Sequence, residues 1–530
     1  MKRALIGEIT QSEPSMTVTV ESKANTQLSF FKRFFPDRVC LILLSLAVGL
    51  GTFFIGQMVL QDFPNSADEH AYRFQAQILS EGRVSVPAHP RQEFFSPFFI
   101  LTHQGRVFAL FPPGWPLLLA LGQSIGRPAI INPLLCAFTV PVLFGIAALL
   151  FDRKTAWLTI PAGILTPFFL LNGASYYSHP SCLFFVLLSL LFFTAVTQKP
   201  PEFVPVSLEI YGFLSGFCAA CAFCIRELTA CAVLVPPFLY VAATVGKRVR
   251  WIAAFLLGAA SLVGGYLWYN AALTGRWFYP VRFLSPGEHL GFGVREIYLF
   301  DYVETRYFGP GNALLSMLRN LGRLFLWTNP LLPLLAIGGF WTHRRTPWIR
   351  VCAASILLLI ASYFFYPSEG GNQYGPRFYY ESLGYFTLLA VAGIRSLQAS
   401  GRRKFTYLIK IVLLLFMLNA LLLAGHGYSQ AKEIYARRTL YRLVEQRRLS
   451  HAVVFVGAPS GGMTQGDLVR NPPQLETANV LFAWDLGERN RELFPDFPDR
   501  SFYFFGINRE TGSYFLQSIS PRLGDTTGFM

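Results

Sequence analysis

The sequence predicts an all-α polytopic membrane protein, with about 11 transmembrane helices and a small α/β domain at the C-terminus. Of its 530 residues, 53% are hydrophobic and only 14% are charged, and the mean hydropathy is +0.40. A soluble domain has about 25% charged residues. Apolar segments of roughly 20 residues, the length that crosses a bilayer, recur as far as residue 425. Residues 426–530 are polar and contain short runs typical of strands.

Residues 1–37 are predicted to form a cytoplasmic N-terminal tail. Residues 1–31 are polar and have no apolar core, which is typical of a disordered segment. The apolar run 39–60 is too long for a signal-peptide core and no small-residue cleavage site follows it, so it predicts an uncleaved helix. Lys32, Arg33 and Arg38 precede this run and place the N-terminus in the cytoplasm.

The basic residues set the number of crossings. Residues 115–151 fit either two short helices or one helix broken near residues 126–128. A single crossing puts the basic clusters at 152–154, 247–250, 343–345 and 402–404 in the cytoplasm, as the positive-inside rule requires. The remaining spans are then expected at about 154–174, 180–197, 207–225, 229–246, 250–272, 316–341, 348–366, 379–397 and 405–425. The net charge of +15 is explained by these short loops, so no nucleic-acid partner is expected.

This topology gathers the polar residues on one side of the membrane, within a domain spanning residues 38–425. The outer side receives the loops 61–114 and 274–315, together with residues 176–179, 226–227 and 368–377. The apolar spans carry almost no ionisable residues, whereas proton-coupled transporters and ion channels place charges near the midplane. The pattern therefore favours a reaction at the outer surface over transport. The loop 274–315 fits either a mobile lid or a plain surface loop.

Asp68, Glu69 and His70 open the first outer loop, at the start of a short amphipathic helix that ends at Gly82. Carboxylates displayed beside a bilayer can act as a general base or bind a hard cation. The run Ser66-Ala67-Asp68-Glu69 also fits a capping box, in which Glu69 has a purely structural role. The spacing alone leaves both interpretations open.

Residues 426–530 are predicted to be an extracytoplasmic α/β domain. A helix is expected over 430–449 and another over 488–494, with strands at 451–456, 479–483 and 501–505. The glycine-rich run 457–462 lacks the Lys-Ser/Thr of a phosphate loop and is interpreted as a turn. Cys218, Cys221 and Cys224 have the spacing of a cluster ligand set, but they lie within an apolar helix and indicate a helix interface.

Several motifs, in this order and topology, resemble the membrane glycosyltransferases of the GT-C fold, in particular the ArnT-like, RgtA-to-D-like and protein O-mannosyltransferase-like enzymes. The motifs are Asp68-Glu69 in the first outer loop, Phe111-Pro112-Pro113-Gly114-Trp115-Pro116, Tyr176-Tyr177-Ser178-His179, Arg226-Glu227-Leu228-Thr229, and Gly375-Pro376-Arg377-Phe378-Tyr379-Tyr380. The resemblance covers about residues 38–425.

The resemblance implies roles for five residues. Asp68 would be the catalytic base, with Glu69 beside it in the catalytic acidic pair, and Arg377 would hold the phosphate of a lipid-linked donor. Arg226 suits the same phosphate-binding role, because a guanidinium binds phosphate in a bidentate manner, but it equally fits an arginine that snorkels at a helix end. A divalent ion (Mg, Mn or Zn) would have Glu69 and His179 as ligands. Where the family often has Arg or Asp after the second-loop Tyr-Ser, this chain has His179 and Pro180.

The sequence thus predicts a bacterial inner-membrane glycosyltransferase of the GT-C type. It would move a sugar from a polyprenyl phosphate to an extracytoplasmic lipid, glycan or protein, with inversion. The alternatives are a transporter or flippase of lipid-linked sugars and a non-catalytic envelope protein that binds them. The sugar and the acceptor are not identified by any residue pattern.

Overall fold

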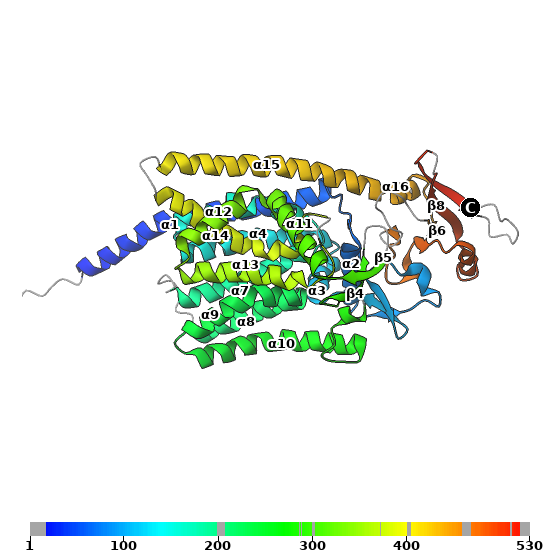
Figure 1. Ribbon diagram of the computed structural model, residues 1–530, viewed down its shortest axis with the longest axis horizontal. Coiled ribbons are helices and arrows are strands. Elements are labelled where there is room, and N and C mark those ends of the chain that lie inside the picture. Colours follow the sequence, from blue (N-terminus) through cyan, green and yellow to red (C-terminus); the bar gives the residue numbers. More distant parts are fainter. Residues whose placement is uncertain are drawn as a thin grey trace, which may run out of the picture.

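The computed structural model describes residues 17–198, 207–285, 287, 289–298, 303–370, 373–399, 404–457, 468–508 and 511–519. A bundle of long helices forms most of it, and a small mixed domain sits at one end of the bundle (Figure 1). The helices of the bundle are α1 (Thr17–Met58), α3 (Gly114–Ser124), α4 (Ile131–Leu150), α5 (Arg153–Ala156), α6 (Pro167–Gly173), α7 (His179–Thr197), α8 (Leu208–Ile225), α9 (Glu227–Thr244), α10 (Arg248–Thr274), α11 (Pro310–Thr328), α12 (Leu331–His343), α13 (Pro347–Phe364), α14 (Leu383–Ala399) and α15 (Lys404–Arg437).

The described residues contain 8 helices long and apolar enough to cross a membrane, or up to 10 if each of two bent helix pairs is one span. The expected number was about 11. The segment predicted at 379–397 accounts for the difference, because it forms a 3₁₀ helix, η6 (Arg377–Ser382), followed by α14 with only 17 residues. Large apolar side chains such as Ile42, Leu46 and Phe54 remain exposed along α1, as expected for a surface that faces lipid. The chain is a multi-pass membrane protein.

Two predicted spans are broken by sharp bends. Arg153–Ile164, which includes the π-helix η3 (Ile160–Ile164), and α6 meet at 69°, and α11 and α12 meet at 104°. The continuous span expected at 316–341 is therefore wrong. The second bend lies at Asn329, which adopts a positive φ of 100°. The next residue, Pro330, has no N–H to continue the hydrogen bonds of the helix. The Asn329 side chain accepts a hydrogen bond from the N–H of Leu331, the first residue of α12.

The segment 115–151 follows the prediction of one crossing. The helix α3 has 11 residues, and only the stretch Pro128–Leu150, which includes α4 and the short η2 (Pro128–Ile130), is long enough to span. The disordered tail expected over 1–31 is helical from Thr17 onward, as part of α1, because no glycine or proline interrupts residues 17–35. Residues 1–16 lie outside the described part.

Close helix packing depends on small residues. Gly212 and Gly216, four residues apart on α8, face α10, where Gly258 approaches the backbone of Phe213. A Cβ atom on Gly216 would collide with the carbonyl oxygen of Phe255. Such small-residue spacing lets helices in a membrane approach closely. The predicted interface role of the cysteines is confirmed, since Cys218 and Cys224 are buried on α8 and the Cys224 thiol lies 3.5 Å from the Leu262 carbonyl of α10.

The loop 61–114, predicted to be the first outer loop, contains a helix and a small sheet. The helix α2 (Ala67–Ser80) is followed by β1 (Val86–Pro87), the 3₁₀ helix η1 (Gln92–Phe95), β2 (Ile100–His103) and β3 (Arg106–Ala109), and the antiparallel strands have the order β1-β3-β2. The loop 274–315 contains η4 (Val281–Leu284) and a hairpin of β4 (Gly293–Tyr298) and β5 (Val303–Phe308). Residues 286, 288 and 299–302 of that loop lie outside the described part.

The C-terminal domain is mixed α/β, as predicted. The strands β6 (Ala452–Val456), β7 (Val480–Trp484) and β8 (Ser501–Ile507) confirm the three expected strands, and β9 (Tyr514–Ile519) adds a fourth that was not predicted. Their order is β7-β6-β8-β9, with β6 parallel to both neighbours and β9 antiparallel to β8. The segment expected as a helix at 488–494 is the 3₁₀ helix η8 (Gly487–Leu493), and η7 (Leu475–Thr477) precedes β7. The turn predicted at 457–462 lies mostly outside the described residues.

The C-terminal domain is joined to the bundle in two ways. The helix α15 runs without a break through residues 426–429, where a separation was expected, and α16 (Thr439–Gln446) follows it toward the sheet (Figure 1). Phe94 and Phe95 of the first outer loop are buried in one apolar cluster with Val453, Phe455 and other residues of the sheet. The first outer loop and the C-terminal domain thus share a core, although nothing in their sequences links them.

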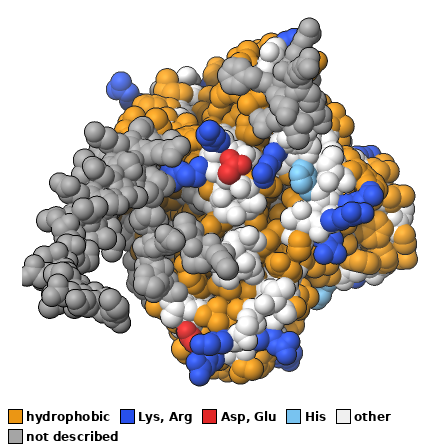
Figure 2. Space-filling model, turned by 90° about the vertical axis from the view of Figure 1, so that its left-hand side faces the viewer, with side chains coloured by type: hydrophobic (Ala, Val, Ile, Leu, Met, Phe, Trp, Pro, Cys, Tyr) orange, Lys and Arg blue, Asp and Glu red, His pale blue; other side chains and the backbone are white. Residues whose placement is uncertain are grey.

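The opposite end of the bundle, where α1 begins, is rich in basic side chains. Figure 2 shows this end with several Lys and Arg groups and few acidic ones among apolar side chains. The loops between α9 and α10 and between α12 and α13 contribute Lys247, Arg344 and Arg345. This distribution is what the positive-inside rule expects of a cytoplasmic side.

Candidate functional site

A cluster of polar side chains lies at the end of the bundle that carries the C-terminal domain. It is built from the start of α2, the turn before α7, the break between α8 and α9, the end of α13, and η6. Its members include Asp68, Ser178, His179, Arg226, Tyr363, Arg377 and Glu381, joined by the contacts given below. The prediction that the polar motifs gather on one side of the bundle is therefore confirmed.

Asp68 lies in the first turn of α2, after the N-cap residue Ser66. Its side chain is 25% exposed, and one carboxylate oxygen lies 3.7 Å from Nη1 of Arg377. A carboxylate that is open to solvent and faces a cation can meet a substrate and take a proton from it.

Arg377 is almost fully buried beside Asp68. Its guanidinium lies 4.0 Å from the centre of the Tyr177 ring, and its Nε donates to the carbonyl of Gly370 over 3.3 Å. The turn that presents Arg377 needs a glycine at position 375, where φ is +90° and a Cβ atom would lie 2.8 Å from the Trp327 ring. This explains why a Gly-x-Arg sequence occurs here.

Arg226 sits at the break between α8 and α9, where an extended backbone replaces the helix. Its Nη2 donates to the Tyr363 hydroxyl over 2.8 Å, Nη1 lies 3.4 Å from the Ser178 hydroxyl, and Nε lies 3.4 Å from Oε1 of Glu381. These contacts fix the plane of the guanidinium. A fixed guanidinium is suited to binding an anionic oxygen.

Glu381 is the functional candidate that the sequence reasoning missed. It is fully buried, and its Oε1 contacts both Arg226 and Nδ1 of His179, the latter at 3.2 Å. Glu381 lies within the segment 379–397, whose apolar composition predicts a membrane span and draws attention away from this one carboxylate. The available signal was a carboxylate at the start of that span, since ionisable residues in membrane segments are costly and usually have a role.

Glu69 has the structural role that the capping-box alternative describes. Its carboxylate accepts the backbone N–H groups of Asn65 at 2.7 Å and Tyr176 at 2.8 Å, and its own N–H donates to the Ser66 hydroxyl. It is fully buried, so it ties the start of α2 to the second outer loop and does not share the exposed position of Asp68. Its catalytic role stays a prediction that this geometry does not favour.

The burial of Glu69 predicts a pH dependence of stability. Desolvation raises the pKa of this carboxyl from 4.5 to about 7, although the two N–H groups act in the opposite direction. Since the folded pKa is raised, the protonated form favours folding, and its stabilisation is lost as the pH rises from about 4.5 through 7. We expect the thermal midpoint in nanodiscs to fall between pH 5 and pH 8, with a Glu69 contribution of about 3 kcal/mol. The fall should be smaller in Glu69→Gln, and equal falls in both proteins would contradict the assignment.

The two predicted metal ligands are each engaged elsewhere. Both Glu69 oxygens accept backbone N–H groups, and His179 contacts Glu381. Among the described residues no group of three or more His, Cys, Asp or Glu side chains could hold a metal ion. The predicted donors thus do not fit a metal site, and the divalent ion stays a prediction.

The loop 274–315 contributes a further ion pair next to the cluster. Arg282 lies 3.5 Å from Glu227 and 3.4 Å from the Tyr366 hydroxyl, and Tyr266 donates to Glu227 over 2.7 Å. Glu227, Tyr266, Arg282 and Tyr366 line a largely apolar cavity of 350 Å³ with Phe223 and Phe278. The role of the loop as a mobile lid stays a prediction.

Comparisons with known proteins identify the fold. No protein-family model and no curated protein match the sequence. Among solved structures, ArnT from Cupriavidus metallidurans bound to undecaprenyl phosphate is similar over 91% of this chain and 96% of its own, with a TM-score of 0.50 and 11% identity. The same enzyme without ligand matches over 89% and 94% of the two chains, with a TM-score of 0.50 and 12% identity. An Archaeoglobus fulgidus oligosaccharyltransferase is similar over 74% of this chain and 56% of its own, with a TM-score of 0.43 and 10% identity. The predicted GT-C fold is confirmed.

Proposed function

We propose that this protein is a membrane glycosyltransferase that moves a sugar from a polyprenyl-phosphate donor to an acceptor hydroxyl outside the cytoplasm. One observation carries the proposal: a partly exposed carboxylate, Asp68, lies 3.7 Å from the buried Arg377 in a cluster that also holds Arg226, at one end of the membrane bundle. This combination provides a base and two phosphate-binding cations where a lipid-linked sugar would reach the surface.

The proposed reaction needs few groups. Asp68 accepts the proton of the acceptor hydroxyl while the hydroxyl oxygen attacks the anomeric carbon. The bond from that carbon to the phosphate oxygen breaks, and its electron pair leaves with the polyprenyl phosphate. Arg226 and Arg377 stabilise the additional negative charge on the phosphate. Attack opposite the leaving group inverts the anomeric centre.

The shared fold supports the choice of donor. ArnT was crystallised with undecaprenyl phosphate, and this chain has the fold of that enzyme along nearly its whole length. The two arginines provide the charge that a phosphate head requires. We place the protein in the bacterial inner membrane, with the basic end of the bundle in the cytoplasm and the Asp68 cluster outside.

The test is donor turnover by the purified protein in nanodiscs. A panel of polyprenyl-phosphate sugars is offered with an envelope-lipid extract as acceptor, and the released polyprenyl phosphate is measured. Release that depends on the acceptor extract would support transfer. If no donor is turned over while a labelled lipid-linked sugar crosses the bilayer in liposomes, the protein is a transporter and the proposal is wrong.

We expect donor turnover not to depend on a divalent ion. Arg226 and Arg377 already provide two positive charges for the leaving phosphate, and the Glu69 oxygens are occupied by backbone amides. Turnover should therefore change less than about twofold when the protein is purified with EDTA. A loss of activity that Mg²⁺, Mn²⁺ or Zn²⁺ restores would instead establish the ion implied by the resemblance.

A further inference from the structure

A cavity of 390 Å³ lies between the helix α2 and the C-terminal domain. The helix contributes His70, Arg73, Phe74 and Gln77, whose spacing places them on one helical face. Asp68 is on the opposite side of α2, toward Arg377. The helix therefore forms a wall between the proposed active site and this cavity.

Two nitrogen donors on this face lack an acceptor. The His70 side chain is 9% exposed, and within the described part of the chain its buried Nε2 has no hydrogen-bond partner. Arg73, one turn further along, makes no ion pair with any described residue, and its guanidinium lies 4.9 Å from the centre of the Tyr176 ring. Arg73 is half-buried, so the cost of a buried nitrogen without a partner applies to His70, and a ligand that bonds to its Nε2 would remove that cost.

The charge around the cavity is positive. Arg470 reaches it from the C-terminal domain, with its guanidinium 4.4 Å from the Phe63 ring and Nη1 donating to the Pro64 carbonyl over 2.6 Å. Burial first, and then the charges of Arg470 and Arg73, hold the pKa of His70 well below its ordinary value, so the imidazole is neutral and can donate through Nε2–H.

The remaining charged groups of the cavity are engaged with each other or with neighbours. Arg438 donates to Gln61 and lies 4.0 Å from Glu445. Asp62, which with Glu445 makes up the two lining carboxylates, accepts a hydrogen bond from the Tyr176 hydroxyl. The three lining arginines thus exceed the two carboxylates by one charge, so the cavity keeps a net positive charge.

We propose that this cavity binds an anionic oxygen group, a phosphate or a carboxylate, of a molecule at the outer membrane surface. His70 donates one hydrogen bond from a neutral imidazole, and Arg73 and Arg470 supply the positive charge.

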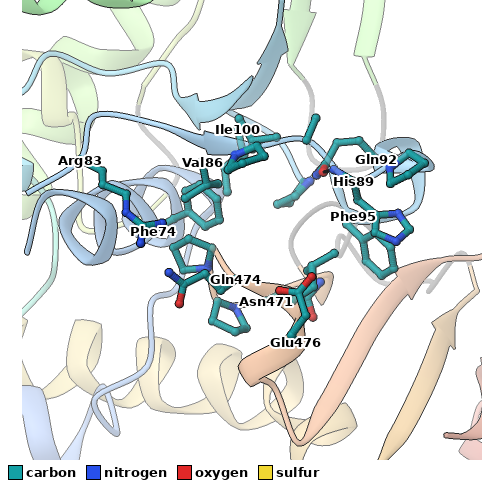
Figure 3. Close-up of a pocket in the computed structure, with 18 of the residues that line it drawn as sticks. Phe74, Arg83, Val86, His89, Gln92, Phe95, Ile100, Asn471, Gln474 and Glu476 are labelled. Atoms are coloured by element: carbon teal, nitrogen blue, oxygen red, sulfur yellow. Dashed lines mark hydrogen bonds between the residues drawn. The ribbon is translucent and has the colours of Figure 1, made fainter. Parts of the chain in front are cut away.

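A second cavity of 240 Å³ shares His70, Phe74 and Asn471 with the first. In Figure 3, Phe74 and Val86 lie on one side of it, with Asn471 and Gln474 of the C-terminal domain on the other. Its prolines, aromatic rings and amides suit the uncharged remainder of the same ligand.

The test measures binding without any glycosyl donor, so its result does not depend on the proposed transfer reaction. In one arm, the protein in phosphatidylcholine nanodiscs is titrated with inorganic phosphate and with glucose 6-phosphate by calorimetry and thermal shift. In the other arm, the nanodiscs contain phosphatidylglycerol. The variants are His70→Ala and Arg73→Gln, with Arg73→Lys to keep the charge. Arg127→Gln is the control, since Arg127 is exposed and lines neither cavity.

We expect the soluble phosphates to bind the wild type and Arg127→Gln equally. His70→Ala and Arg73→Gln should each weaken binding by about tenfold or more, and Arg73→Lys should recover part of the affinity. If phosphatidylglycerol abolishes this binding and raises the thermal midpoint of wild type but not of Arg73→Gln, a lipid headgroup is the occupant. Binding that all variants share, or no effect of any anion in either arm, would overturn the site.

Discussion

Replacement of Asp68 by asparagine is expected to lower donor turnover by about 10²–10⁴-fold, the range that the loss of a general base produces. Asparagine has the size of aspartate and keeps an oxygen that can face Arg377, 3.7 Å away, but it cannot take the proton of the acceptor hydroxyl. The released polyprenyl phosphate is measured under saturating donor. The loss should appear in the turnover number and not in the KM for the donor, because the base acts only in the transition state.

Asp499→Asn provides the matched control. Asp499 is an exposed aspartate of the C-terminal domain, and its substitution should leave turnover and thermal midpoint unchanged. Equal turnover by Asp68→Asn and wild type would remove Asp68 from the mechanism, while the GT-C fold would stand.

The sequence carried most of the information on the fold and on which residues gather at the same end of the bundle. Apolar length and basic loops defined the spans, and these placed Asp68, Arg226 and Arg377 at one end of the bundle. The reason is physical: a bilayer leaves a helix few alternatives, so the order of spans fixes the side on which each loop emerges. That order, combined with a motif resemblance, predicted Asp68 and Arg377 on the same side of the bundle, whereas their contact, across 309 residues of sequence, is seen only in the structure.

Local geometry could not be predicted in the same way. Asp68 and Glu69 are neighbours in sequence, yet the Asp68 carboxylate is partly exposed beside Arg377, whereas the Glu69 carboxylate is buried and accepts two backbone N–H groups. The spacing of these residues in the sequence does not tell a catalytic base from a carboxylate that caps a helix. The bend at Asn329 and the burial of Phe94 in the C-terminal sheet both depend on packing between segments that are distant in sequence.

Glu381→Gln is expected to reduce the free energy of unfolding by about 3–5 kcal/mol, because it leaves Arg226 with a buried charge and no carboxylate. Glu381 is fully buried, and the Arg226 side chain is 14% exposed. Thermal unfolding at pH 8 in nanodiscs measures the loss. Glu93→Gln is the matched control, since Glu93 pairs with Arg489 at 2.7 Å but the two side chains are 45% and 52% exposed, and such a pair contributes about 1 kcal/mol or less. Equal, small losses in both variants would show that Glu381 does not balance Arg226.

The double variant Arg226→Met/Glu381→Met separates the structural role of this ion pair from its role in the reaction. Two apolar side chains of similar volume replace both charges, so the stability should return to near that of the wild type. Donor turnover should stay low, with a raised KM for the donor, because the guanidinium that binds the phosphate is absent. Restored stability together with restored turnover would mean that Arg226 only holds the fold, and Arg377 would then be the single phosphate-binding arginine of the proposed mechanism.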